Sequence, residues 1–213
     1  MSFLKRPIEI RTNRCLLTEM KVADAPFWFE FMADERVRQY LPDRIETVAA
    51  MKSTLEWLVS NYHRDISEIE RLTLATYLKD DKGGPVGWVT YGPLPEDGRL
   101  QEIGYAIGPA RRGKGLATES AEGFIGYLRE NVTRRKLYAT VDKDNSASIN
   151  VLKKLGLKKA GNSAAGMPNA LKNHELYHLV RRERRRGGSG RLPDPRPAPR
   201  PTRPPGVRMK AKG

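Results

Sequence analysis

The sequence predicts a mixed α/β fold in a single domain that is followed by a basic tail. The segment Asp80–Gly84 has the composition of a turn and separates two strand-like stretches, 72–78 and 86–91, which predicts an antiparallel hairpin. Residues 100–108 and 136–141 instead flank a helix, which favours a parallel pair joined by a right-handed crossover. We therefore expect a mixed, mostly antiparallel sheet with helices on both faces.

The first third of the chain is predicted to hold one strand and three helices. Residues 8–20 form an extended stretch that we expect to be the first strand. Asp24 and Pro26 mark a helix start, because aspartate accepts unpaired N–H groups of a first turn and proline fits within that turn. A short helix follows over 34–40, and apolar residues at three-to-four spacing predict an amphipathic helix over 47–62.

The last third of the folded part is predicted to hold two helices and the remaining strands. An apolar face recurs through 116–131 and indicates a helix. Asn145 is a suitable N-cap for the next helix, and Gly156 is a suitable residue to end it. The last two strands are expected at 157–160 and 173–180.

Charge is concentrated at the C-terminal end of the chain. The 213 residues carry a net charge of +14, of which residues 181–213 supply +10 and residues 1–180 only +4. After the flexible segment Gly187–Gly190, prolines alternate with other residues and no aromatic side chain follows. Such a composition cannot bury a core, so we expect residues 1–180 to form the domain and residues 181–213 to be a disordered Arg/Pro-rich tail.

Composition argues against several classes of protein. The longest uninterrupted apolar run, Val48–Met51, is far shorter than the ~18 residues of a membrane helix. The first residues are charged and lack the apolar centre of a secretion signal, so we expect a cytoplasmic protein with no membrane contact. Cys15 is the only cysteine, which excludes an internal disulfide. His174 and His178 share one face of a predicted strand without a suitably spaced carboxylate, so we expect no metal site.

A glycine-rich segment, 108–118, lies between a predicted strand and a predicted helix. The first N–H groups of a helix have no partner within it, and glycines let an anion approach them closely. The helix dipole and the side chains of Arg111, Arg112 and Lys114 add positive potential. These properties predict a phosphate-binding loop, and the alternative is a tight turn with solvated basic side chains.

Three phosphate-binding motifs compete for this segment. A Walker A loop needs Ser or Thr after Lys114, where the chain has Gly115. A dinucleotide-binding fingerprint needs a third glycine where the chain has Thr118. The pattern Arg-x-x-Gly-x-Ala matches Arg112–Ala117 in full.

The segment Arg112–Ala117 resembles the pyrophosphate loop of the GNAT superfamily of N-acyltransferases. Glu102–Gly108 is similar to the family's central strand, and Asp144–Ser148 with Lys154–Leu157 is similar to its last helix. The details, including the opening Thr12–Leu17, are most similar to the branch of ribosomal-protein N-terminal acetyltransferases. The resemblance covers roughly residues 10–180 and ends before the tail.

This resemblance implies a sheet that is splayed between two central parallel strands, near 100–108 and 136–142, and that binds acetyl-CoA as a co-substrate without a metal. It also implies which residues bind the donor. The pantetheine arm would pair with the backbone of Tyr105, Ala106 and Ile107, the pyrophosphate would meet the amides of Arg112, Gly113, Lys114, Gly115, Leu116, Ala117 and Thr118, and Asn145 would help to place the arm near the thioester.

The resemblance also suggests catalytic residues. Many members carry a tyrosine that protonates the leaving thiolate, but the matching position here is Leu152, so Ser148, one turn earlier, is the candidate donor. A serine in a first turn also commonly serves the helix end itself. Glu102 is the candidate base, acting directly or through water, and its alternative is an exposed strand carboxylate. Glu19 and Glu175 are weaker candidates for the base.

The sequence thus predicts an acetyl-CoA-dependent N-acetyltransferase that moves an acetyl group directly to a primary amine. A protein N-terminus and a small-molecule amine both remain open as acceptors, as do a monomer and a homodimer. The alternative is a nucleic-acid- or ribosome-binding protein that acts through its basic tail, since twelve tail bases would give strong, salt-sensitive contact with RNA.

Overall fold

The structure of the chain is a computed structural model. It describes residues 3–41, 43–81, 83–94, 97–133, 136–160 and 173–179, together with the backbone of 208–209. The predicted tail therefore lies outside the described residues apart from Arg208–Met209, which form β10 and pair with β3 (Asp43–Arg44). No helix of the described part is both long and apolar enough to cross a membrane.

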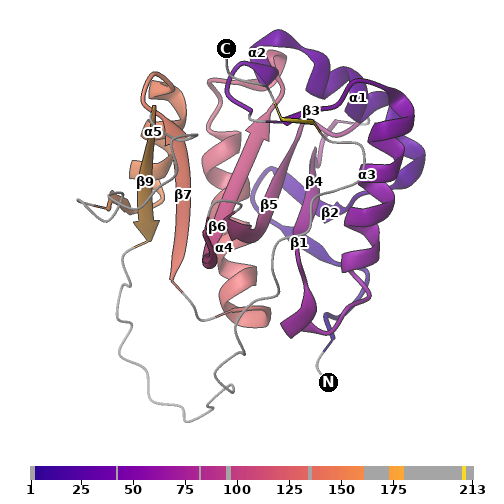
Figure 1. The fold of residues 1–213 in the computed structure, drawn as a ribbon, viewed down its shortest axis with the longest axis horizontal. Helices are drawn as coiled ribbons and strands as arrows, with labels where there is room; N and C mark the ends of the chain where they lie inside the picture. Colours follow the sequence, from indigo (N-terminus) through magenta and orange to yellow (C-terminus); the bar gives the residue numbers. More distant parts are fainter. Residues whose placement is uncertain are drawn as a thin grey trace.

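An eight-stranded sheet forms the centre of the molecule (Figure 1), in the order β1-β2-β4-β5-β6-β7-β9-β8. Its neighbours pair antiparallel except β6 and β7, which are parallel. The strands are β1 (Glu9–Arg11), β2 (Cys15–Glu19), β4 (Leu72–Leu78), β5 (Gly87–Leu94), β6 (Asp97–Ile107), β7 (Leu137–Asp142), β8 (Leu157–Lys159) and β9 (His174–Leu179).

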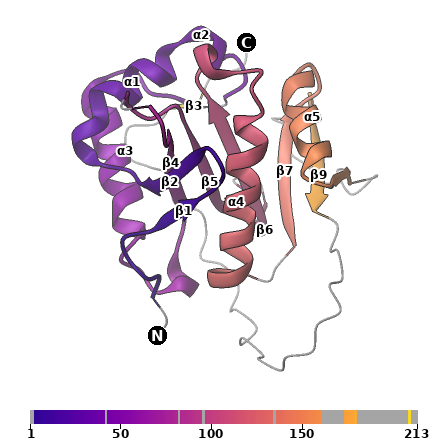
Figure 2. The same cartoon turned by 180° about the vertical axis from the view of Figure 1, so that it is seen from behind.

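Helices cover both faces of this sheet, as the sequence predicts. They are α1 (Ala25–Ala33), α2 (Glu35–Arg38), α3 (Val48–Asn61), α4 (Leu116–Asn131) and α5 (Ser146–Lys154). Figure 2 shows α4 and α5 in front of the same face. In β4, Leu74 belongs to the apolar cluster on that face, while the next residue, Ala75, belongs to a second cluster with α1 and α3. The period of two along a strand therefore divides the core into two layers.

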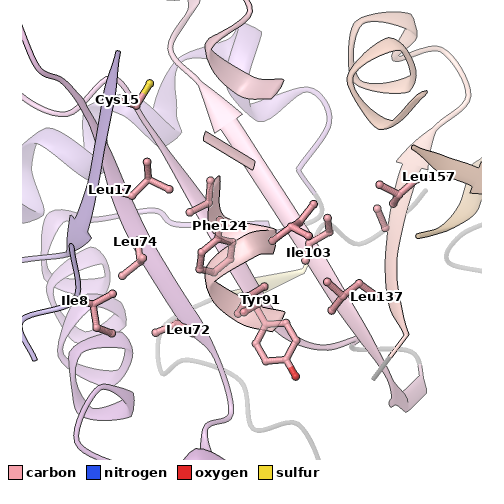
Figure 3. Packing of buried hydrophobic residues seen from close by; sticks show 14 of the residues in the cluster. Ile8, Cys15, Leu17, Leu72, Leu74, Tyr91, Ile103, Phe124, Leu137 and Leu157 are labelled. Atoms are coloured by element: carbon pink, nitrogen blue, oxygen red, sulfur yellow. The ribbon is translucent and has the colours of Figure 1, made fainter. Parts of the chain in front are cut away.

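The larger cluster packs α4 against the middle of the sheet. Phe124 of α4 is fully buried and lies among side chains of β2, β4 and β6, including Leu17, Leu74 and Ile103 (Figure 3). Leu152 of α5 belongs to the same cluster. Because α4 is fixed along its length by this packing, its N-terminal end has a defined position at the end of β6.

One local expectation from the sequence is wrong, and a second, Asp24 as the N-cap of α1, is confirmed in position but not in its hydrogen bond. The stretch 8–20 is not one strand but a hairpin of β1 and β2, because Thr12 closes a turn: its hydroxyl accepts the Cys15 N–H at 3.0 Å. Such local side-chain bonds compete with the sheet ladder. The predicted boundaries of α4 agree with the structure.

Tyr62, at the end of α3, forms hydrogen bonds with Met20, which follows β2, and with Thr73 of β4. Loss of its hydroxyl should destabilise the fold. Its buried hydroxyl accepts the Met20 N–H at 2.9 Å and donates to the Thr73 carbonyl. We expect Tyr62→Phe to lower the free energy of unfolding by ~1–3 kcal/mol, because a backbone donor and a backbone acceptor lose their partner in the core. Urea unfolding measures this, with the exposed Tyr40→Phe as control. Equal effects of the two substitutions would contradict it.

Candidate functional site

The parallel strands β6 and β7 separate soon after they meet. Their ladder consists of two pairs, Gln101↔Leu137 and Glu102↔Tyr138, whereas β6 stays paired with β5 as far as Ile107. Figure 1 shows the two strands drawing apart beyond this point. The β7-facing edge of β6 is thereby left without a strand partner over 103–107 in the described part of the chain.

Alternation along β6 decides which of the predicted residues face this edge. Successive residues of a strand direct their N–H and C=O groups to opposite sides. The Gly108 N–H donates to the Val86 carbonyl at 2.8 Å, so even-numbered residues such as Ala106 face β5. The backbone groups of Tyr105 and Ile107 accordingly face β7. The sequence predicts the same backbone role for Tyr105, Ala106 and Ile107, whereas in the structure the backbone groups of Ala106 face β5.

Glu102 stands where the ladder stops. Its Oε1 accepts the Thr140 N–H at 3.1 Å and also the Thr140 hydroxyl. A continued parallel ladder would give that N–H to a carbonyl of β6. The carboxylate therefore takes the place of one rung of the sheet, and it lies partly exposed on the α1/α3 side.

Ser148 and Asn145 lie across the separation from Tyr105. The Tyr105 hydroxyl is 3.0 Å from Ser148 Oγ and also donates to the Ser148 carbonyl at 3.2 Å. Burial raises the pKa of Tyr105 to about 12, against a smaller lowering from the Ser148 hydrogen bond. Asn145 Oδ1 accepts the Ser148 N–H at 3.0 Å and so caps α5, as the sequence predicts. The sequence predicts only a backbone role for Tyr105 and does not predict this side-chain contact.

The glycine loop leads directly into α4. Gly113 and Gly115 have φ of +78° and +77°, a left-handed conformation that other residues rarely adopt. Gly115 is the N-cap of α4, and no side chain caps the helix there. The first N–H groups of this 16-residue helix therefore remain available to an external acceptor.

Two of the three predicted cationic side chains of the loop are engaged within the protein. Arg111 pairs with Asp81. Arg112 donates from Nε to the Ile107 carbonyl and from Nη2 to the Arg36 carbonyl, both at 2.9 Å, and so joins the end of β6 to α2. Lys114 is exposed and forms no ion pair with any residue that the structure describes.

The turn of the β1–β2 hairpin contacts the same loop. The Arg14 guanidinium donates to the Lys114 carbonyl at 2.9 Å and pairs with Glu119 of α4 at 2.7 Å. The Arg14 N–H and the Thr12 hydroxyl donate to the other Glu119 oxygen at 2.6 and 2.7 Å. Neither Arg14 nor Glu119 was predicted as a site residue. The only sequence feature that pointed to this region was Thr12–Leu17, whose similarity to one branch of the family does not indicate a contact with the loop.

The weaker candidate bases are held in ion pairs. Glu19 binds Arg6 and accepts the Ile8 N–H, and Glu175 pairs with Lys159. No group of three or more His, Cys, Asp or Glu side chains arranged to hold a metal ion occurs among the described residues.

Known proteins resemble this chain in sequence and in fold. The model of the acetyltransferase (GNAT) domain matches residues 14–158. The N-acetyltransferase YnaD of Bacillus subtilis is 26% identical over 157 residues, which is 72% of this chain and 85% of YnaD. RimJ of Mycobacterium smegmatis, solved in complex with CoA-disulfide, superposes with a TM-score of 0.63 at 21% identity, covering 82% of this chain and 88% of RimJ. The ribosomal-protein-S5-alanine acetyltransferase of Vibrio fischeri has a TM-score of 0.61 at 18% identity, covering 83% and 98%.

A mixed sheet opened between two parallel strands, with an uncapped helix beginning at the end of one of them, defines an acyltransferase fold. The match over most of the chain makes the assignment specific: the protein belongs to the GNAT family of acetyltransferases. It is an enzyme of the N-acetyltransferase class.

Glu119 should make the stability of the folded protein depend on acid pH. Partial burial acts to raise its pKa, but the hydrogen bonds from the Arg14 N–H, the Thr12 hydroxyl and the Arg14 guanidinium outweigh this and lower the pKa to about 2. A carboxyl whose pKa is lowered by folding stabilises the protein above its ordinary pKa of about 4.3, and this stabilisation is lost as the pH falls towards 2.

We therefore expect Glu119→Gln to lower the free energy of unfolding at pH 7 and to narrow its difference from wild type as the pH falls from 5 to 3. Urea unfolding at pH 7, 5, 4 and 3 measures this difference. Glu122→Gln in the same helix, whose carboxylate the structure pairs with no cation among the described residues, is the control. A difference that stays constant with pH would show that the Glu119 charge is not coupled to folding.

Proposed function

We propose that this enzyme transfers the acetyl group of acetyl-CoA directly to a primary amine. The observation that carries the proposal is the early end of the β6/β7 ladder. It leaves a carboxylate, Glu102, on one side of the separation and a hydroxyl pair, Tyr105 and Ser148, on the other. Both stand near the unpaired edge of β6, which leads to the uncapped start of α4.

The residues available in this region fit acetyl-CoA. The β7-facing N–H and C=O of Tyr105 and the N–H of Ile107 offer hydrogen bonds to the amide-containing pantetheine arm, in the manner of an added strand, while the Ile107 carbonyl already accepts from Arg112. Ala106 lies between Tyr105 and Ile107 in β6, and its own backbone groups face β5. Asn145 would help to place the arm, because its side chain caps the start of α5. The pyrophosphate would be held by the amides of the loop and of the first turn of α4, from Arg112, Gly113, Lys114, Gly115, Leu116, Ala117 and Thr118.

Glu102 and Ser148 are the groups that we propose to move protons. The attacking amine must be neutral, since an ammonium group has no lone pair. Glu102 would accept the amine proton, directly or through one water, and such help is typically worth ~10²–10⁴-fold in rate. As the C–S bond breaks, Ser148 would donate its hydroxyl proton to the CoA thiolate and would take up a proton from solvent water in its place. Tyr105 supports this role, because its hydroxyl fixes the position of Ser148 Oγ.

The acceptor class that we propose is a primary amine on a protein N-terminus or on a small molecule. The V. fischeri neighbour is named for acetylating a ribosomal protein, which supports the first of these. A cytoplasmic location, a monomeric or homodimeric state and a dispensable, RNA-contacting tail at 181–213 stay predictions. Mass spectrometry of a panel of peptide and metabolite amines incubated with labelled acetyl-CoA would identify the acceptor.

Acetyl-CoA should stabilise the protein, and a side chain at Gly115 should abolish this effect. At a hundredfold excess over its dissociation constant, a ligand raises the free energy of unfolding by ~2.7 kcal/mol. Gly115→Val would strain a residue at φ +77° and crowd the first N–H groups of α4. Gly156→Val, at φ +80° after α5, imposes similar strain away from the loop and is the matched control. The melting temperature with and without acetyl-CoA measures the effect.

The control should keep the ligand-dependent shift although its own melting temperature falls. A wild-type protein that Mg-ATP stabilises and acetyl-CoA does not would contradict the proposal and indicate a nucleotide triphosphate site.

Ser148 and Glu102 should affect turnover in different ways. Ser148→Ala should lower kcat ~10-fold or more with little change in affinity for acetyl-CoA, because the thiolate exists only late in the reaction. Glu102→Gln keeps an oxygen for the Thr140 N–H but removes the base, so its rate should recover at high pH, where more of the amine is already neutral. The pH–rate profiles of both variants measure this, with Glu175→Gln as control. Wild-type turnover in both variants across the pH range would show that these two residues are structural.

A further inference from the structure

The contact between the β1–β2 turn and α4 joins residues that are far apart in the sequence. Five interactions, all between 2.6 and 2.9 Å, connect Thr12 and Arg14 with Lys114 and Glu119. The Nη2 atom of Arg14 would also lie 3.6 Å from a Cβ placed on Gly115, so the guanidinium lies against the N-cap of α4. Acetyl transfer itself does not require the β1–β2 turn to be bound to the N-terminal end of α4, so this contact calls for an explanation of its own.

Glu119 creates a conflict of charge at the start of α4. A carboxylate in a first turn stabilises a helix, because it interacts favourably with the positive end of the dipole. The same positive end is what would attract a pyrophosphate, and a negative side chain nearby opposes that attraction. Arg14 resolves the conflict because its guanidinium pairs with the Glu119 carboxylate. The lowered pKa of Glu119, about 2, agrees with this pairing.

The second contact of Arg14 sets the direction of a backbone amide. In a planar trans peptide the C=O and the following N–H point in opposite directions. Arg14 Nη1 donates to the Lys114 carbonyl, which turns that carbonyl towards the hairpin. The Gly115 N–H, at the other side of the same peptide, must then point away from the hairpin. The lone pairs of the Lys114 carbonyl oxygen therefore point away from the side on which an anion would bind.

We propose that Arg14 is a positioning residue for the anion-binding loop: it neutralises Glu119 and orients the Lys114–Gly115 peptide so that the loop N–H groups donate to a pyrophosphate. The inference rests on the proposed binding of acetyl-CoA at this loop. We propose no contact between Arg14 and acetyl-CoA itself. The role of Arg14 concerns the affinity of the loop for acetyl-CoA, whereas Glu102 and Ser148 concern the chemical step.

The test compares the binding of CoA with that of pantetheine, which lacks the pyrophosphate. Titration calorimetry on the full chain would give both dissociation constants for wild type, Arg14→Ala, Arg14→Lys, Glu119→Gln and Arg14→Ala/Glu119→Gln. Arg11→Ala is the matched control, because Arg11 lies in the same hairpin and pairs only with the exposed Glu9 among the described residues. Melting curves without ligand would monitor the fold of each variant.

Arg14→Ala should weaken CoA binding by about tenfold, as expected for the loss of one charge-assisted interaction, and leave pantetheine binding within about twofold. The double variant should bind CoA more tightly than Arg14→Ala, because the uncompensated carboxylate is gone. Arg14→Lys should fall between wild type and Arg14→Ala, since lysine keeps the charge but not the fork of donors. Arg11→Ala should resemble wild type.

Four results would overturn the inference. Equal losses for CoA and pantetheine in Arg14→Ala would show a general structural effect. A double variant no tighter than Arg14→Ala would show that the charge of Glu119 does not act on the ligand. Unchanged CoA binding in Arg14→Ala would remove the role altogether while leaving the proposed function intact, whereas a wild-type protein that fails to bind CoA would overturn both.

Discussion

The site depends on one interrupted ladder. Two parallel strands in a sheet normally continue to pair along their shared length, and each added rung lengthens the contact. Here the Thr140 N–H donates to the carboxylate of Glu102 instead of to a carbonyl of β6. A side chain thus joins the two strands at a point where a backbone hydrogen bond would bring them closer together. The residues that we propose for acyl transfer, Glu102, Tyr105 and Ser148, lie close to this point.

The separation would be unstable if its backbone groups were left among apolar side chains, since unpaired buried N–H and C=O groups are strongly unfavourable. The chain satisfies some of them internally. Arg112 takes the Ile107 carbonyl, and the Tyr105 hydroxyl spans the separation to Ser148 on α5. The remaining groups lie on an edge that a peptide-like ligand can pair with. Phe124 of α4 and Leu152 of α5 belong to one apolar cluster that also contains residues of β6 and β7, so this packing supports both sides of the separation.

Much of this architecture could be predicted from the sequence. The helix at 116–131 was predicted with the correct bounds, because its apolar period and the preceding Gly115 indicate the same starting residue. The order strand, helix, strand over 100–141 also predicted the parallel pair of β6 and β7. The turn at Thr12 was missed because a short polar interruption inside an extended stretch carries little periodic signal. The contact of Arg14 with Glu119 spans 105 positions and leaves no local pattern. The direction of the Tyr105 side chain follows from strand alternation, but its partner on α5 depends on how two distant elements pack.

The engagement of Arg112 and Arg111 within the protein bears on selectivity between anions. A loop whose cations were all exposed would attract any polyanion in proportion to its charge, including nucleotides and nucleic acids. In this chain those guanidinium groups are already satisfied by carbonyls of Ile107 and Arg36 and by Asp81. In the proposed site, recognition at the helix start would therefore depend on directed N–H groups and on Lys114, the loop cation without an ion pair among the described residues, and so on the shape and spacing of a phosphate pair more than on its total charge.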